Sequence, residues 1–386
     1  MNIFITGVAG FLGSNLADFY IRKGFNVSGC DNLVGGDLDN VDSKVKFYKA
    51  DCEDLNKMQE ITKNIDVVIH AAAYAHEGLS VVSPNIICSN IVSGSTGIFS
   101  AAISNKVKRI VFCSSMARYG NIKQPFLEDD IPNPVDPYGI SKLAAEKILI
   151  NLCETYGVEY NIAVPHNIIG VKQKYDDPFR NVASIMINLM LQNRQPIIYG
   201  DGEQKRSFSD IDDCIYCIDK LTLDPNITSQ LVNIGPGPEN QITVNKLYEI
   251  IANQLQFNQE PRREPERVNE VKNAICSSDL ADKLLNLRPN RNIDDVIVKG
   301  KTEPVGVYEV LDYHTNETFP NMVDALGLFN QGFDLYKQGR WDKAIKQFKS
   351  VLKANPKDIA AQMYLDRCDI LKNKKPKKWN GIWIMT

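Results

Sequence analysis

Residues 1–13 read MNIFITGVAGFLG, and this stretch decides the fold. The apolar run at 2–6 predicts a short buried strand. Gly7, Gly10 and Gly13 follow it, and a helix is expected from there to about Lys23, with Gly24 as its stop. Glycines between a strand and a helix let backbone N–H groups approach a pyrophosphate, so the stretch predicts a dinucleotide-binding turn. A plain tight turn is the alternative for the triplet alone.

Strands and helices alternate after this turn. Further strands are expected at 25–30, 45–50, 66–70 and 109–113, with helical stretches between them. This alternation, without tight hairpin turns, predicts an α/β fold with a doubly wound, Rossmann-type parallel sheet. The second strand ends at Asp31, the third at Asp51 and the fifth at Ser115. Ligands of such sheets bind at the carboxyl ends of the strands, where these side chains are expected.

The second half of the chain has a mixed pattern. It contains strand-like stretches at 161–165 and 196–200 and a helix-like stretch at 184–193. We expect an NAD-binding Rossmann domain over 1–160, to which 183–195 and 205–235 partly return. A smaller mixed α/β part over 161–290 would bind the substrate, and a third segment would cover 291–386.

The third segment is expected to hold a β-hairpin at 295–310 and amphipathic helix from 321 to about 372. The spacing of one tetratricopeptide repeat is matched by Gly332, Leu335, Gly339, Ala344, Phe348 and Pro356. A single helical pair cannot bury its own apolar face, so it must dock on something, which makes a protein partner possible. The basic run at 372–378 indicates a solvated surface.

The composition is that of a soluble globular protein. The 386 residues are 44% hydrophobic and 24% charged, with a net charge of -3, which argues against a nucleic-acid or membrane-surface protein. The nine scattered cysteines predict no disulfide framework and a reduced, cytoplasmic setting. Cys214 and Cys217 are expected to be small buried residues of a helix. No apolar run of about 18 residues was found, so no membrane span is predicted, and the four histidines suggest no metal site.

Tyr138 and Lys142 carry the strongest chemical signal. They lie four apart in a helix-forming stretch, so both project from one helix face. A lysine ammonium stabilises a nearby phenolate and can make the phenol a base near neutrality. The spacing alone arises often by chance. Ser115 completes a set, because its hydroxyl could hold the reacting oxygen against Tyr138, although a serine at a strand end is usually a turn former.

Two aspartates are candidates for the adenosine half of a cofactor. Asp31 should accept the ribose hydroxyls, and a carboxylate there repels a 2′-phosphate, which favours NAD over NADP. Asp51 could contact the adenine amino group. Its alternative is the N-cap of a helix over 52–58.

Together these residues resemble the extended short-chain dehydrogenase/reductase family, in particular its NAD-dependent sugar-nucleotide epimerases. The resemblance runs from Met1 to roughly Arg288. It rests on TGVAGFLG at 6–13, HAAA at 70–73, SSMARYG at 114–120, YGISK at 138–142, PHNIIG at 165–170 and YGDGEQKRSF at 199–208. It implies that Tyr138 removes a sugar hydroxyl proton while hydride passes to NAD. Lys142 would hold the nicotinamide ribose and Ser115 the sugar oxygen.

The resemblance also implies the contacts of the ligands. Cofactor contacts would come from Gly7, Gly10, Phe11, Leu12, Gly13, Asp31, Asn32, Asp51, Cys52, Ala71, Ala72, Ala73, Asn90, Tyr138, Lys142 and Pro165. The family's asparagine would align with Ile91, one place after Asn90. Substrate contacts besides Ser115 would come from Asn167 to the diphosphate, Asn181 and Val182 to the uracil, Tyr199 packing on it, and Arg206 and Arg267 clamping the phosphates. Each arginine alone could equally form a surface ion pair.

Two further positions bear on the reaction and on the sugar that it acts on. Family dehydratases and decarboxylases resemble one another in an acid two positions after the catalytic Ser/Thr, whereas Met116 and Ala117 stand here, which favours 4-epimerisation. Ala274 stands where these epimerases limit the room around C2 of the sugar, so UDP-N-acetylhexosamines are expected beside UDP-glucose and UDP-galactose.

A homodimer through helices near 90–105 and 138–153 is implied by the same resemblance. The alternatives are a dehydratase or reductase of the same fold, or a non-enzymatic scaffold that binds the cofactor and docks through its tail.

The family's closing segment after the 280s is replaced. The stretch 295–314, the single repeat and the ending WNGIWIMT at 379–386 resemble the C-terminal end of bacterial class III nucleotide cyclases. No cyclase core precedes this tail, so no cyclase activity is expected.

Overall fold

The computed structural model describes residues 1–174, 181–266, 273–287, 322–356 and 358–374. The chain forms two compact units, Met1–Glu303 and Pro304–Thr386, which are described separately. Arg267, the hairpin expected at 295–310, the end of the basic run and the ending at 379–386 lie outside the described residues.

A seven-stranded parallel sheet forms the centre of the first unit, in the order β11-β6-β5-β4-β1-β2-β3. Its strands are β1 Asn2–Thr6, β2 Asn26–Asp31, β3 Lys46–Lys49, β4 Val67–His70, β5 Arg109–Cys113, β6 Glu159–Pro165 and β11 Gln230–Ile234. The doubly wound sheet predicted from the sequence is confirmed, and each strand expected in the first 113 residues is present. The order of the strands changes direction between β1 and β4: β2 and β3 follow on one side of β1, and β4, β5 and β6 on the other. Such folds bind ligands at this point.

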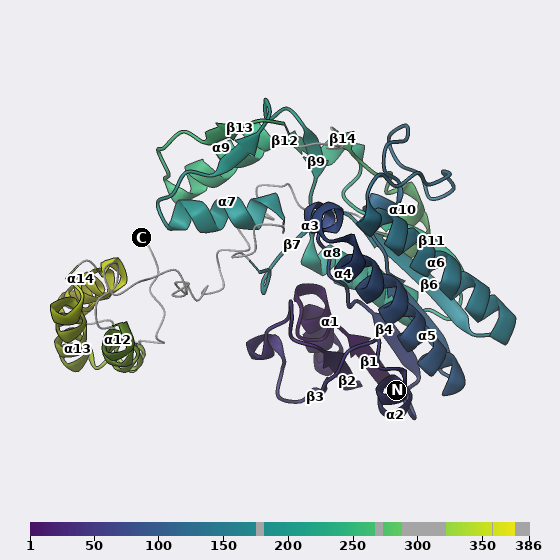
Figure 1. Ribbon diagram of the computed structural model, residues 1–386, viewed down its shortest axis with the longest axis horizontal. Helices are drawn as coiled ribbons and strands as arrows, with labels where there is room; N and C mark the ends of the chain where they lie inside the picture. Colours follow the sequence, from purple (N-terminus) through teal and green to yellow (C-terminus); the bar gives the residue numbers. More distant parts are fainter. Residues whose placement is uncertain (175–180, 267–272, 288–321, 357, 375–386) are drawn as a thin grey trace. The chain divides into compact units, whose positions relative to one another are not determined.

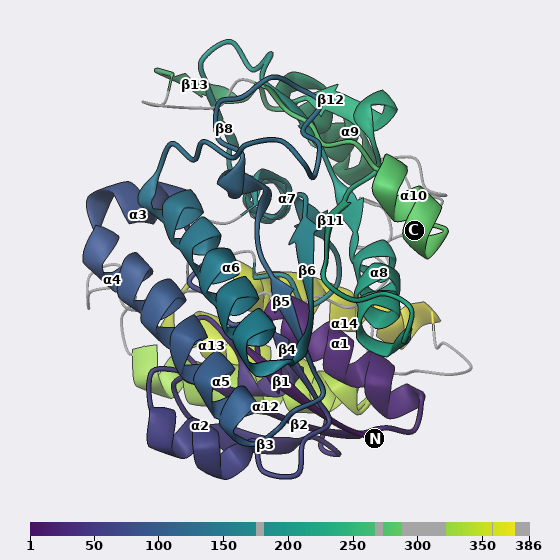
Figure 2. The same cartoon turned by 90° about the vertical axis from the view of Figure 1, so that its right-hand side faces the viewer.

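Helices cover both faces of the sheet, as Figure 2 shows. One face carries α1 Phe11–Arg22, α8 Ile211–Leu223 and α10 Asp279–Leu285, and the other carries α2 Leu55–Ile61, α5 Gly94–Ser104 and α6 Pro137–Tyr156. Side chains of β1 alternate between the two cores, with Ile3 and Ile5 on one side and Phe4 on the other. Cys214 and Cys217 are fully buried in α8, which confirms their expected place.

The smaller mixed part lies beyond the carboxyl ends of the central strands (Figures 1 and 2). Its helices α7 Val182–Leu191 and α9 Val244–Leu255 pack together around Met186 and Leu247 in a third core. Its short strands are β7 Ile168–Ile169, β8 Ile197–Tyr199, β9 Lys205–Ser207, β10 Ser209–Asp210, β12 Gln241–Thr243, β13 Arg262–Glu264 and β14 Asn273–Ala274. This part therefore overhangs the edge where the sequence places the ligand.

A continuous helical stretch precedes β5 and corrects one expectation. Pro84–Ser104 spans 21 residues with a mean hydropathy of 1.5, enough by length and composition to cross a membrane, although the sequence reading singled out no such run. It joins α4 Pro84–Cys88, a π-helical turn Ser89–Ser93 and α5, and follows α3 Glu77–Val82. Ile91, Ile98 and Phe99 are buried in the core of the sheet. This packing is that of a core helix, and core helices can be as long and apolar as membrane spans.

The second unit contains three described helices, α12 Met322–Lys337, α13 Trp341–Ala354 and α14 Ile359–Lys374. Phe348 of α13 is fully buried and stacks on Tyr364 of α14 with ring centroids 5.6 Å apart. A Cβ at Gly332 would lie 2.9 Å from the Phe348 ring, so only glycine fits at this crossing of α12 and α13. The third helix thus covers apolar surface that a single helical pair would leave open.

Candidate active site

Tyr138 and Lys142 lie on one buried face of α6. The helix begins at Pro137, and the Asp136 carboxylate caps it by accepting a hydrogen bond from the Gly139 N–H at 2.8 Å. Tyr138 is 6% exposed and Lys142 is 3% exposed. The Lys142 Nζ donates to the carbonyl of Cys113, the last residue of β5, at 2.8 Å. Burial lowers the pKa of Lys142 to about 8.

Ser115 follows β5 and lies next to the start of α6. Its Oγ accepts a hydrogen bond from the Ala117 N–H at 3.2 Å and caps the short 3-10 helix Met116–Arg118, which packs against α6. The turn-forming role weighed for this serine is therefore present. The same placement leaves Ser115 half-buried at the edge that also holds Lys142.

The glycine turn has the shape that a pyrophosphate needs. Gly7 has φ +69°, and its N–H donates to the Cys30 carbonyl at 2.8 Å. A Cβ at Gly7 would lie 2.9 Å from Ala72 Cα, and a Cβ at Gly13 would lie 2.1 Å from the Gly7 carbonyl oxygen. Both positions lie against backbone, so side chains there would force the turn apart. The tight turn leads directly into the N-terminus of α1, which fits the diphosphate of a dinucleotide. Phe11 and Leu12 form the first turn of α1, and Ala71–Ala73 follow β4 beside the cradle.

Acidic and amide groups line the neighbouring strand ends. The Asp31 carboxylate accepts hydrogen bonds from the Ala9 N–H at 3.2 Å and the Leu33 N–H at 2.8 Å, and burial raises its pKa. The Asn32 amide donates to Asp51 at 2.8 Å and to the Tyr74 hydroxyl at 3.0 Å. This group provides the oxygen acceptors expected for an adenosine. Asp54, and not Asp51, is the N-cap of α2, so the alternative reading of Asp51 as that cap is wrong.

Asn90 and its neighbour Ile91 differ in what they contact. Asn90 lies in the π-helical turn Ser89–Ser93, which adds one residue to a helical turn. Its Oδ1 accepts a hydrogen bond from the Tyr74 N–H at 2.9 Å, whereas Ile91 is buried in the core. Asn90 therefore faces the segment that follows β4, beside the proposed cofactor.

The remaining cofactor candidates lie close to this edge. Cys52 is 8% exposed, and its carbonyl oxygen lies so close to Gly97 of α5 that a side chain at position 97 would collide with it. Pro165 is the last residue of β6, next to β5 in the sheet.

The substrate candidates fall into two groups. Asn167 has φ +39°, and its side-chain amide donates to the Ser207 carbonyl at 3.0 Å. Arg206 of β9 and Ala274 of β14 are register partners in parallel strands. Ala274 is 2% exposed, and its carbonyl oxygen lies 2.8 Å from His166 Nε2. The structure thus brings Asn167, Arg206 and Ala274 to one place.

The second group lies on α7 and β8. Asn181 caps α7 by accepting a hydrogen bond from the Ala183 N–H at 2.9 Å, and Val182 is the first residue of this helix. Tyr199 is the last residue of β8. The contacts expected of these three residues with a uracil stay predictions.

Comparison with known proteins decides the family. The model of the NAD dependent epimerase/dehydratase family matches residues 3–235. The chain belongs to this family. A tetratricopeptide-repeat model matches 325–358 of the second unit, which confirms the repeat predicted from its spacing.

Relatives of this epimerase/dehydratase family member carry sugar-nucleotide names. A protein of Methanocaldococcus jannaschii, provisionally named a UDP-glucose 4-epimerase, is 36% identical over 274 residues, 70% of this chain and 87% of its own. A UDP-glucose 4-epimerase of Thermotoga maritima, solved with UDP-glucose, superimposes with a TM-score of 0.75 at 30% identity, covering 78% of this chain and 97% of its own. A UDP-N-acetylglucosamine 4-epimerase of Methanobrevibacter ruminantium gives 0.73 at 28% identity, with coverages of 78% and 97%.

Sequence reasoning missed a buried polar chain beneath the site. The ring of His70 joins Thr6 through Nδ1 at 2.7 Å and Ser95 through Nε2 at 2.9 Å. Thr6 Oγ1 also accepts from the Ala72 N–H at 3.1 Å, so its proton is available to the imidazole. This chain ties the strand before the glycine turn to β4 and α5. Thr6 and His70 end neighbouring parallel strands, which is the signal that could have found them.

Acid should destabilise this family member through two buried histidines. Burial lowers the pKa of His70 to about 3 and that of His166 to about 4. Between these values and about pH 6.5 the unfolded chain binds more protons than the folded chain. The free energy of unfolding therefore decreases as the pH is lowered, by about 1.4 kcal/mol per pH unit for each histidine. His70→Gln should reduce this slope by one proton in urea titrations at several pH values. Equal slopes in the variant and the wild type would contradict the prediction.

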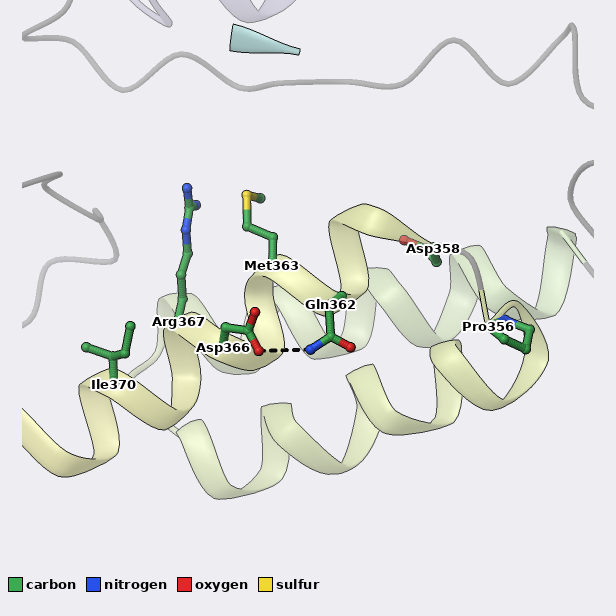
Figure 3. A pocket seen from close by; sticks show the side chains of 7 residues that line it. All are labelled: Pro356, Asp358, Gln362, Met363, Asp366, Arg367 and Ile370. Carbon is green, nitrogen blue, oxygen red and sulfur yellow. Dashed lines mark hydrogen bonds between the residues drawn. The ribbon is translucent and has the colours of Figure 1, made fainter. Parts of the chain in front are cut away.

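The second unit offers a separate surface, a shallow hollow on α14 (Figure 3). Met363 and Arg367 project from one side of the helix, and Gln362 donates a hydrogen bond to Asp366 at 2.8 Å. The hollow is lined by Pro356, Asp358, Gln362, Met363, Asp366, Arg367 and Ile370. Among the residues that the structure describes, no Tyr or Lys side chain lines it. Over the described ranges, no group of three or more His, Cys, Asp or Glu side chains could hold a metal.

Proposed function

We propose that this chain catalyses the NAD-dependent epimerisation of a UDP-hexose at C4. The observation that carries the proposal is a single sheet edge that holds the glycine cradle, Asp31 and the buried Tyr138–Lys142 pair. The named relatives act on nucleotide sugars, which supports the substrate class.

The residues divide the chemistry among them. The Tyr138 phenolate takes the proton of the sugar C4 hydroxyl, and the Lys142 ammonium favours that phenolate. The Ser115 hydroxyl holds the sugar oxygen during the transfer. NAD, when bound in the cradle, supplies a hydride acceptor and gives the hydride back. Tyr138 then returns its proton after the ketose has turned its other face, so the enzyme needs no second redox substrate.

The segment after Ser115 favours epimerisation over elimination. Met116 and Ala117 form the 3-10 helix there, and neither side chain can act as an acid or a base. Elimination of water from the 4-ketose needs such a group beside the sugar. A dehydratase or reductase is the alternative within the family, and a 4-keto-6-deoxy product or consumption of added NAD(P)H would indicate it.

The experiment is a product analysis with four substrates. Purified protein with NAD is given UDP-glucose, UDP-galactose and the two N-acetyl forms, and the epimers are separated by chromatography and identified by mass spectrometry. We expect at least one epimer pair to interconvert. If all four sugars stay unchanged, the proposal fails.

The sugar itself is chosen by the overhanging part. Ala274 beside Arg206 is a small residue where the resemblance expects the C2 substituent, so N-acetyl forms are included as substrates. Arg206 with Arg267, Asn167, Asn181, Val182 and Tyr199 would hold the UDP group.

A homodimer through α5 and α6 is part of the proposal. Helices α3, α4 and α6 pack together, and Val82, Ile86 and Ile140 are exposed on them. Exposed apolar side chains on helices that pack together favour an interface here. Light scattering that gave only the monomer mass would contradict it.

The tail keeps two open predictions. The hollow on α14 is where the expected protein partner would bind (Figure 3). A scaffold without enzyme activity is the third alternative, favoured only if the full chain bound a partner and turned over no sugar. The likeness of 295–314 and 379–386 to cyclase ends stays a prediction.

A further inference from the structure

A buried ion pair lies directly behind the proposed active site. Arg118 is 6% exposed and Glu146 is 1% exposed. The Arg118 Nε donates to both carboxylate oxygens of Glu146, at 2.9 and 3.0 Å. The Ser114 hydroxyl donates to the same carboxylate. Three side chains from two elements therefore meet at one charge.

The composition of this pair is poor for stability alone. Burial raises the pKa of Glu146, which means that the fold disfavours its charge. The Nη1 nitrogen of the Arg118 guanidinium has no hydrogen-bond partner among the described residues. Buried ion pairs of this kind are often replaced by apolar side chains of similar volume without loss of stability.

The pair joins the two segments that carry the chemistry. Glu146 lies on α6, one turn after Lys142 and two turns after Tyr138. Ser114 and Arg118 stand on either side of Ser115 along the chain. The carboxylate thus holds the serine segment at both ends against the helix of the base.

The arginine also fixes the next residue. Its guanidinium carbon lies 4.6 Å from the centre of the Tyr119 ring, and the Tyr119 hydroxyl donates to Asn233 of β11 at 2.8 Å. Arg118 is therefore held by the ring on one side and by Glu146 on the other. These contacts link the position of α6 to the serine segment.

We propose that Glu146 and Arg118 are positioning residues that set the distance between the Ser115 hydroxyl and the Tyr138–Lys142 pair. The proposal rests on the proposed epimerisation. Neither residue touches the sugar. Loss of the pair lets the serine segment shift against α6, and a shift of about 1 Å at a reacting centre can cost about 10²-fold in rate.

The test is the double variant Arg118→Met with Glu146→Met, which keeps length and removes both charges. We expect it to bind NAD and to unfold at the wild-type temperature or above it. Its kcat should fall about 10²-fold, while KM for the UDP-sugar changes little, because the nucleotide contacts lie elsewhere. Arg118→Lys keeps the charge but loses the fork, and should recover part of the lost kcat.

Arg109→Met is the matched control. Arg109 is also a buried arginine paired with a glutamate, Glu159, but it lies at the opposite end of β5. Its loss should lower the unfolding temperature and leave kcat of the folded protein unchanged.

The outcomes are distinct. A double variant with normal stability and normal kcat would overturn the inference while the proposed function stands. A double variant that does not fold would also overturn it, since the pair would then be a requirement of folding. A wild-type chain without turnover would instead overturn the proposed function, and this inference with it.

Discussion

Tyr138→Phe should abolish turnover of the UDP-sugar while NAD stays bound. The substitution removes one oxygen and keeps the ring, which is 6% exposed and belongs to the main core cluster. The base is lost and the packing is kept, so we expect a fall in kcat of about 10²- to 10⁴-fold. Epimer chromatography measures the turnover, and the absorbance of nucleotide released on denaturation measures the bound NAD.

Tyr156→Phe provides the control on the same helix. Tyr156 is the last residue of α6 and is 64% exposed, so the loss of its hydroxyl should change neither value. If Tyr138→Phe turned over sugar at the wild-type rate, the assignment of the base would be wrong. If it lost both turnover and NAD, the residue would serve the cofactor site and not only the proton transfer.

Gly13→Ala should yield protein without NAD. The added methyl carbon would lie 2.1 Å from the carbonyl oxygen of Gly7 and 2.7 Å from its carbonyl carbon. Both are backbone atoms of the cradle, so the turn itself must move. Overpacking of this kind costs about 1–3 kcal/mol, and the displaced N–H groups no longer converge on a diphosphate. Nucleotide content and thermal unfolding measure the two effects.

Gly24→Ala separates backbone strain from the cradle. Gly24 has φ +82°, and a Cβ there meets no atom within 4 Å. The cost is then the left-handed conformation alone, about 1–2 kcal/mol, with unchanged NAD content. A Gly13→Ala protein that kept a full complement of NAD would show that the cradle does not hold the diphosphate.

Local patterns were enough for the five strands of the first 113 residues and for the first helix, whereas β11 Gln230–Ile234 was not expected as a strand. The apolar run of β1 and the glycines after it predict a strand, a tight turn and a helix. The strands at 66–70 and 109–113 are short apolar runs between helices. Tyr138 and Lys142 were also accessible, because a helix fixes which residues share a face. These inferences need only neighbours in sequence.

The polar groups beneath the site were not accessible in this way. Arg118 and Glu146 are 28 positions apart, and nothing in either segment shows that the two meet. The π-helical turn that holds Asn90 and Ile91 is not visible in the periodicity of the sequence. The apolar stretch before β5 was overlooked because polar residues such as Ser93 and Thr96 interrupt it. The meeting of Arg118 with Glu146 depends on a contact between segments that are distant in sequence.

The cap of α6 has a consequence for heat. Tyr138 stands in the first turn of its helix, and the ends of helices open before their middles. The Asp136 carboxylate accepts from the Gly139 N–H, the Ser141 hydroxyl donates to the Pro137 carbonyl, and the packing of Tyr138 in the core adds to these contacts. Local melting of this one turn would displace the base while the seven-stranded sheet remained folded. Warming would then abolish turnover reversibly, at a temperature below that at which the protein unfolds.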